Sequence, residues 1–114
     1  MISVNGTTIT MTRGDTAVIH VSMTRDGTAY NPVSGDEVRF AMRLAGLNAK
    51  GTEYKYPVCL EKTIPIDTMN LTIEPNDTKE LGFGEYVYDI QITFENGSVD
   101  TFITTATLII APEV

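Results

Sequence analysis

Hydrophobic and polar positions alternate along three segments of this chain, which cover residues 16–24, 37–44 and 85–94. The alternation is cleanest in the second segment, where Val38, Phe40 and Met42 are separated by polar or small residues. Period two is what a strand shows when one face lies on a core and the other faces water, as in antiparallel sheets. We therefore predict three regular antiparallel strands.

Four further segments predict shorter or less regular strands, and they cover residues 7–12, 54–64, 69–73 and 98–110. The last of these is long, and its threonine-rich middle suits strand geometry. Its length predicts a bulge or bend that lets it pair with two neighbours. Helix is nearly absent from the prediction, apart from one turn over residues 77–81 that begins at Asn76 or Asp77 and ends before Gly82.

Three dipeptides are typical of type I′ hairpin turns, namely Asn5-Gly6, Asp26-Gly27 and Asn96-Gly97. With them, the chain contains seven or eight short strands separated by turns about every 8–12 residues, which is the pattern of a β-sandwich. No linker, internal repeat or low-complexity tract interrupts it. The sequence therefore predicts an all-β fold, an antiparallel β-sandwich that forms a single domain over residues 1–114.

The charge balance narrows the class of partner. Eight basic against fifteen acidic residues give a net charge of −7. A nucleic-acid surface needs clustered basic residues, and docking on an anionic membrane needs them too, so we expect neither nucleic acid nor membrane as a partner. The first six residues contain no basic or long apolar region, and we predict no signal peptide.

Candidate catalytic chemistry is sparse. Cys59 is the only cysteine and His20 the only histidine, and the two belong to different predicted strands. Cys59 lies in the apolar run 57–60, where we expect a small buried hydrophobic side chain rather than a nucleophile. We therefore predict that the protein is not an enzyme and that it binds no cofactor.

Two weaker motifs are interpreted structurally. The tripeptide Arg13-Gly14-Asp15 falls between two predicted strands, where a glycine turn is needed. Acidic residues gather near several turns, but they show no spacing typical of a metal-binding loop. We predict a turn for the first motif and no metal site for the second.

Residues 77–86 contain a candidate structural motif of β-sandwiches, a tyrosine corner, which we predict from the following residues. Asp77 and Thr78 lead through a short turn to Gly84 and Tyr86, which resembles the tyrosine corner of immunoglobulin-like sandwiches. In that corner a tyrosine near the start of a strand donates a hydrogen bond back to the preceding connection. We expect Tyr86 or Tyr88 to play this structural part, with Asp77 in the connection, so the predicted sandwich is immunoglobulin-like.

Four segments carry a wider likeness, and they are residues 10–23 (beginning TMTRGDT), 35–40 (GDEVRF), 73–90 (IEPNDTKELGFGEYVYDI) and 95–102 (ENGSVDTF). Together they resemble small structural proteins encoded by phages and prophages of Gram-positive bacteria. The nearest named group is the N-terminal immunoglobulin-like domain of phage upper baseplate proteins.

This resemblance implies a non-catalytic structural or accessory protein of the tail or baseplate type. Such a protein acts by protein–protein contact, with other phage structural proteins or by self-association, in the virion or the bacterial host cytoplasm. Two alternatives stay open at this point. One is a carbohydrate- or cell-surface-binding β-sandwich module that uses loop tips and tyrosines. The other is a small hydrolase in which folding brings two carboxylates together.

Overall fold

The two segments with the cleanest alternation form the centre of the main sheet. They are β5 (Glu37–Leu44) and β8 (Gly84–Thr93), which pair antiparallel with Phe40 opposite Ile90. In this computed structural model, which describes residues 8–112 without the side chains of Thr104 and Thr105, both residues are fully buried. Alternation along the two strands therefore places one face of the sheet on the core, as predicted.

The main sheet has five strands in the order β1-β9-β8-β5-β6. Its remaining members are β1 (Ile9–Thr12), β6 (Val58–Ile64) and β9 (Val99–Ala111). The order β9-β8-β5-β6 matches the G-F-C-C′ order of variable-type immunoglobulin domains. The predicted turn at Asn5-Gly6 lies outside the described residues.

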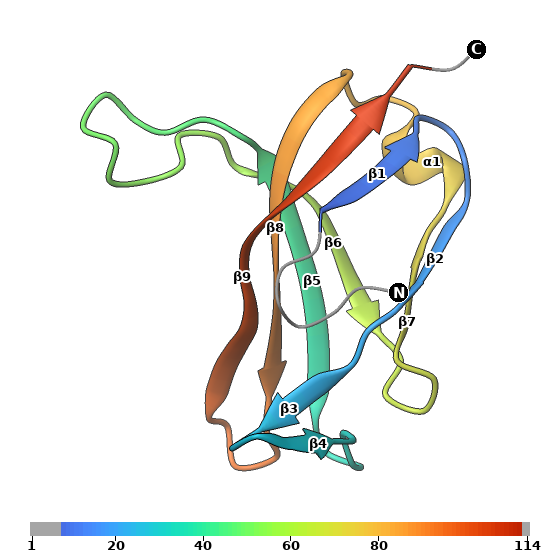
Figure 1. The fold of residues 1–114 in the computed structure, drawn as a ribbon, viewed down its shortest axis with the longest axis vertical. Helices are drawn as coiled ribbons and strands as arrows, with labels where there is room; N and C mark the ends of the chain where they lie inside the picture. The colour runs from blue at the N-terminus through green and yellow to red at the C-terminus, as the bar shows by residue number, and fades with distance from the viewer. Residues whose placement is uncertain (1–7, 113–114) are drawn as a thin grey trace.

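The long strand β9 pairs with two neighbours, as its length predicted. It is antiparallel to β8, and its register against β8 shifts twice, around Ile90. Its C-terminal part runs parallel to β1, with Ile9 opposite Leu108. This parallel pair departs from the purely antiparallel prediction, because β1 and the C-terminal part of β9 run in the same direction (Figure 1).

Four shorter strands lie opposite the main sheet. β2 (Ala17–His20) pairs with β7 (Asn70–Ile73), and β3 (Met23–Arg25) pairs with β4 (Thr28–Tyr30). The single strand predicted over residues 16–24 is thus divided at Val21 and Ser22, where the chain changes partner. Because this predicted strand becomes two and β4 is added, residues 8–112 contain nine strands. Two of them, β3 and β4, are only three residues long.

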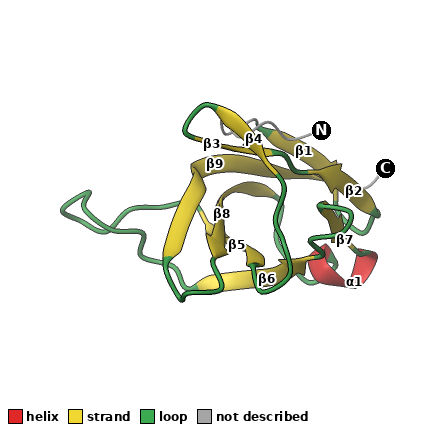
Figure 2. Cartoon of the chain, turned by 90° about the horizontal axis from the view of Figure 1, so that it is seen from below, coloured by secondary structure: helices red, strands yellow, loops and turns green. Residues whose placement is uncertain are grey.

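Apolar side chains from both layers meet in one core. Leu71 and Ile73 of β7 and Val21 between β2 and β3 join Phe40 and Tyr88 of the main sheet, and all five are at most 2% exposed. Figure 2 shows the strands arranged around this common interior. The predicted all-β, immunoglobulin-like sandwich is therefore confirmed.

The two predicted type I′ turns that lie within the described residues differ. Asp26 and Gly27 both have positive φ, as a type I′ turn requires, and they join β3 to β4. At the second site only Gly97 has positive φ, and the Phe94 amide donates to the Ser98 carbonyl at 2.8 Å. The type I′ prediction for Asn96-Gly97 is wrong, because one extra residue lies in the loop and leaves only its last position left-handed.

The single described helix, α1 (Pro75–Thr78), begins two residues before the predicted turn. Glu74 is the N-cap, and its backbone amide donates to the Asp77 carboxylate at 2.7 Å. Pro75 occupies the first helical turn, where its fixed φ is already helical and its missing amide costs nothing. Asp77 is therefore inside the helix rather than at its start.

Candidate functional site

The predicted corner residues have structural roles. The Tyr86 hydroxyl donates to the Gly82 carbonyl oxygen at 2.8 Å, a bond that ties β8 to the connection before it. Tyr88 lies in the core, with its ring centroid 5.4 Å from that of Phe40. Asp77 is paired with the Lys62 ammonium at 2.6 Å, which joins α1 to β6. Of the two tyrosine candidates, Tyr86 makes a hydrogen bond of the corner type.

These tyrosines are not available to a sugar. Tyr86 is 4% exposed and Tyr88 is 2% exposed, so neither ring offers a face to a ligand in water. Burial raises the pKa of both phenols, and that of Tyr88 reaches about 12. Both rings therefore belong to the core and lend no support to a stacking platform.

The Arg13-Gly14-Asp15 segment is a turn held against the body. Gly14 has positive φ, and its amide donates to the hydroxyl of the buried Thr78 at 2.9 Å. The Arg13 guanidinium lies 4.3 Å above the Phe83 ring and donates to the Leu81 carbonyl at 3.4 Å. The predicted turn is confirmed, and its arginine is engaged within the chain.

The prediction of a buried Cys59 is wrong. Cys59 is exposed on the edge strand β6, since its odd position points away from the core that Leu60 and Ile64 face. Its thiol donates weakly to the Met42 carbonyl at 3.5 Å, and partial burial raises its pKa. A raised thiol pKa is the reverse of what a nucleophilic cysteine needs.

His20 lies on β2, in the other layer, and its Nδ1 is 3.0 Å from the Asn70 side-chain oxygen. Within residues 8–112, no group of three or more His, Cys, Asp or Glu side chains is arranged to hold a metal ion. In the same range, no helix is long and apolar enough to cross a membrane.

The most prominent feature outside the core is a projecting connection between β5 and β6. It comprises residues 45–57, which we call the arm, and it extends away from the sandwich as a narrow loop (Figure 1). The sequence predicted a strand from residue 54, but β6 begins only at Val58. Tyr54 and Tyr56 therefore belong to the arm.

The arm is held in shape by its own hydrogen bonds. Leu47 and Tyr54 form an antiparallel bridge, and the Asn48 amide donates to the Glu53 carbonyl at 2.7 Å. At the tip, the Asn48 side-chain oxygen accepts the Thr52 amide at 3.0 Å, in the way that Asn side chains close turns. The tip is therefore a closed turn rather than an open strand of chain.

The base of the arm is fixed to the sheet by close packing. Gly46 has a φ of +152°, and a Cβ there would lie 2.8 Å from the Tyr56 ring, so the position requires glycine. The Arg43 guanidinium of β5 donates to the Tyr56 carbonyl at 3.3 Å. The arm therefore leaves the body in a set direction.

The arm exposes one large apolar side chain and two cations. Leu47 is 50% exposed, and Lys50 and Lys55 are both exposed. The arm contains a single acidic residue, Glu53, so it is net positive. The net charge of the arm is +1 and that of the whole chain is −7, so the rest of the chain carries a net charge of −8.

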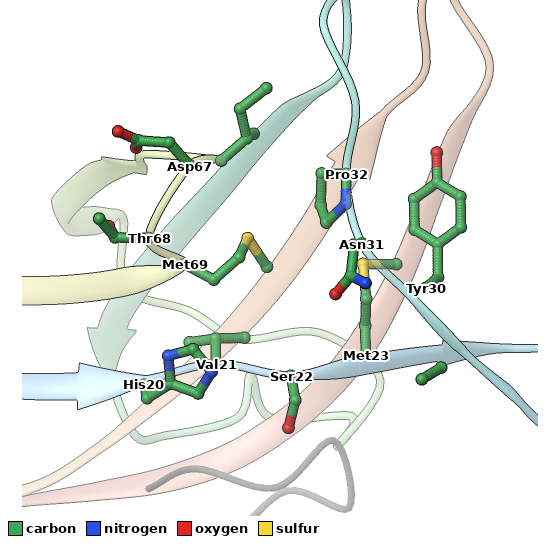
Figure 3. Close-up of a pocket in the computed structure, with 12 residues that line it drawn as sticks. His20, Val21, Ser22, Met23, Tyr30, Asn31, Pro32, Asp67, Thr68 and Met69 are labelled. Atoms are coloured by element: carbon green, nitrogen blue, oxygen red, sulfur yellow. The ribbon is translucent and has the colours of Figure 1, made fainter.

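A second feature is a pocket of about 440 Å³, which we call the methionine pocket. Its apolar lining includes the nearly buried Val21, Met23 and Met69, all at most 7% exposed, and the partly exposed Tyr30, Pro32 and Ile66. Figure 3 shows Met69 on one side of it and Met23, next to Asn31, on the other. A volume of this size lies in the range of about 300–1,000 Å³ that is usual for binding pockets.

Met69 is held in an uncommon backbone conformation at the pocket. Its φ is +54°, which is rare for a residue with a side chain. Its amide donates to the Pro65 carbonyl at 2.7 Å, and its own carbonyl accepts the Val21 amide at 2.8 Å. These two bonds keep the 66–69 loop against the β2–β3 junction and so shape the pocket.

The polar residues of the methionine pocket are not arranged as a catalytic triad. His20, Ser22 and Asp67 all line it. In the part of the chain that the structure describes, no hydrogen bond joins His20 to either of the other two, and the imidazole pairs with Asn70 instead. The arrangement lacks the nucleophile–base–carboxylate chain that acyl transfer requires.

Sequence reasoning missed both the arm and the methionine pocket. The arm had one sequence signal, because 13 residues separate β5 from β6 and β-hairpin loops usually have about 2–5. The pocket had none, since its lining comes from residues 20–23, 29–32 and 66–69, which folding brings together.

Two comparisons with known proteins, by family model and by curated sequence, were made for this chain. No protein-family model and no curated protein sequence matches this chain. The likeness to phage structural proteins therefore stays a prediction from the sequence.

Proposed function

We propose that this chain is a non-catalytic structural protein that acts by protein–protein contact, with the arm as its contact element. The observation that carries the proposal is the arm itself. Its 13 residues far exceed what is needed to join two neighbouring antiparallel strands, and their tip is closed by its own hydrogen bonds. Because the arm is already ordered by its own hydrogen bonds, it presents Leu47 to a partner with little further loss of conformational entropy on binding.

The physical character of the arm supports a protein partner. Its exposed leucine suits an apolar hollow, and the lysines around it suit a rim of opposite charge. The resemblance to phage structural proteins supports a tail or baseplate setting for this contact, with other structural proteins or further copies as partners. A gene neighbourhood without tail or capsid genes would count against that setting.

The contact is tested with a photo-cross-linking amino acid placed at Leu47 in the cells that produce the protein. The matched control carries the same amino acid at Val99, an exposed apolar residue at the short β8–β9 turn. We expect a discrete protein adduct from position 47 and none from position 99. Equal labelling from both positions, or no adduct from position 47, contradicts the proposal.

A further inference from the structure

We propose that the partner of the arm is a second copy of the same chain, whose methionine pocket receives the arm of its neighbour. This inference rests on the proposed function and names its partner. It joins two features that belong to different parts of the chain, and the position, shape and charge of these features support it.

Position excludes docking within one chain. The arm leaves from the C-terminal end of β5 and returns at the N-terminal end of β6. The pocket loops, residues 29–32 and 66–69, lie at the opposite ends of these same strands. Eight residues of β5 separate the two features by roughly 25 Å at about 3.4 Å per residue, and Figure 1 shows the arm far from the β3–β4 hairpin. The arm therefore reaches a methionine pocket only on another copy.

Shape suits an apolar side chain on a narrow ribbon. The partly exposed apolar residues of the pocket are Tyr30, Pro32 and Ile66. Met23 and Met69 also line it but are almost fully buried, and the pocket volume accommodates Leu47 together with part of the adjoining turn. Methionine side chains adapt to the shape of an inserted group because they are unbranched and flexible. Insertion of Leu47 covers apolar surface on both copies.

Charge selects this orientation over others. The arm carries Lys50 and Lys55 against one glutamate, whereas the body of each copy is net −8. Asp67 lies at the pocket, so an arriving arm meets a carboxylate near the apolar surface. Two bodies approaching without the arm between them repel one another, and complementary charge raises the rate and specificity of the arm-to-pocket encounter.

The contact has a consequence for assembly. It uses different surfaces on the two copies, so it is heterologous and leaves a free arm at one end and a free pocket at the other. Such a contact repeats, and it produces a closed ring or an open filament according to the rotation between successive copies.

The test uses two variants that each lack one half of the contact. The arm variant is Leu47→Glu with Lys50→Glu, and the pocket variant is Asp67→Lys with Thr68→Lys. All four positions are exposed in the described structure, so circular dichroism is expected to show an unchanged fold. Association is measured by sedimentation velocity over a range of concentrations at low and high salt.

The wild-type protein is expected to grow beyond a dimer as concentration rises, and to dissociate as salt screens the charges. Each variant alone is expected to associate at least about tenfold more weakly, through loss of the insertion and reversal of charge. An equal mixture of the two is expected to form dimers that grow no further, because it contains one intact pocket and one intact arm per pair.

Three results overturn the inference. They are a wild-type protein that stays monomeric, an arm variant that associates as strongly as wild type, and a mixture that stays monomeric while wild type associates. If the wild type is monomeric but position 47 still cross-links to a different protein in cells, the self-association is wrong and the proposed function stands. If position 47 gives no adduct in cells, the proposed function is wrong whatever the purified protein does.

Discussion

In the body of the sandwich, residues of β5 alternate between full burial and partial exposure, whereas no residue of the arm is fully buried. Phe40 is completely buried, and Leu47, only seven residues later, is 50% exposed. The body is stabilised by apolar burial between its two layers. The arm is stabilised by local hydrogen bonds and by the packing of Tyr56 on Gly46.

A second connection of the same sheet sharpens the contrast. The β8–β9 connection, residues 94–98, needs only five residues, and the Asn96 side-chain oxygen accepts the Ser98 amide at 2.9 Å. The arm closes its tip in a similar way with Asn48, but only after extending the chain away from the sheet. Five residues are enough to join neighbouring strands, so the additional length of the arm is not required by the fold.

The largest expected difference between body and arm is in stability. Phe40→Ala removes a fully buried ring between the layers and is expected to lower the free energy of unfolding by about 3–5 kcal/mol. Leu47→Ala, on the arm, is expected to change it by less than about 0.5 kcal/mol. Urea denaturation of both variants measures this difference. A Leu47→Ala loss close to that of Phe40→Ala shows that the arm is part of the core.

The second prediction concerns the pH dependence of the body. Burial raises the pKa of Tyr88 from its ordinary value of 10.0 to about 12. A phenol with a raised pKa in the folded protein contributes stability that is complete below about pH 10 and is lost as the pH rises toward 12. Between these values, wild type is expected to lose roughly 2–3 kcal/mol relative to Tyr88→Phe.

Denaturation of the two proteins at intervals from pH 8 to pH 12 measures the Tyr88 contribution. The difference between them removes the titration of other groups, because these are common to both. A constant difference across this range contradicts the assignment of the raised pKa to Tyr88.

The third prediction compares two tyrosines, Tyr86 and Tyr54, that both lie in segments predicted from the sequence as strands. Tyr86→Phe removes the donor to the Gly82 carbonyl and is expected to cost about 1 kcal/mol, at the low end of the range because Gly82 is exposed to water. Tyr54→Phe, in the arm, is expected to change stability by less than about 0.5 kcal/mol. Thermal denaturation at neutral pH measures the melting temperature of both variants. A Tyr86→Phe variant that melts at the same temperature as wild type excludes a tyrosine corner at that position.

The same contrast explains how much of the molecule could be predicted from its sequence. Alternation located β5 and β8 because each has one buried and one exposed face, and side-chain period is the signal that a buried face leaves. Cys59 was misplaced because its apolar neighbours in the sequence suggested a buried run. On an edge strand, only every second residue of that run faces the core.

The features proposed for function leave weaker traces in the sequence. The arm lacks a fully buried face, and the alternation of its last residues, 54–57, was interpreted as the start of a strand, so only the distance between β5 and β6 indicates the arm. The methionine pocket depends on a left-handed Met69 and on three segments that are distant in the chain. Neither its existence nor its position opposite the arm follows from local pattern, because both depend on the order of strands in the sheet.

Shortening the arm is expected to change stability less than the substitutions at Phe40, Tyr88 and Tyr86. Replacing residues 49–52 by Asn-Gly closes the tip on the hydrogen-bonded pair Asn48 and Glu53 with a two-residue type I′ turn. Because halving a loop recovers only about 0.6 kcal/mol of closure entropy, the free energy of unfolding is expected to change by less than about 1 kcal/mol. The same replacement removes Lys50 from the tip, so we expect it to weaken association while the fold persists. Urea denaturation and sedimentation velocity on one sample measure both quantities, and a shortened arm that unfolds the sandwich shows that the body depends on the arm after all.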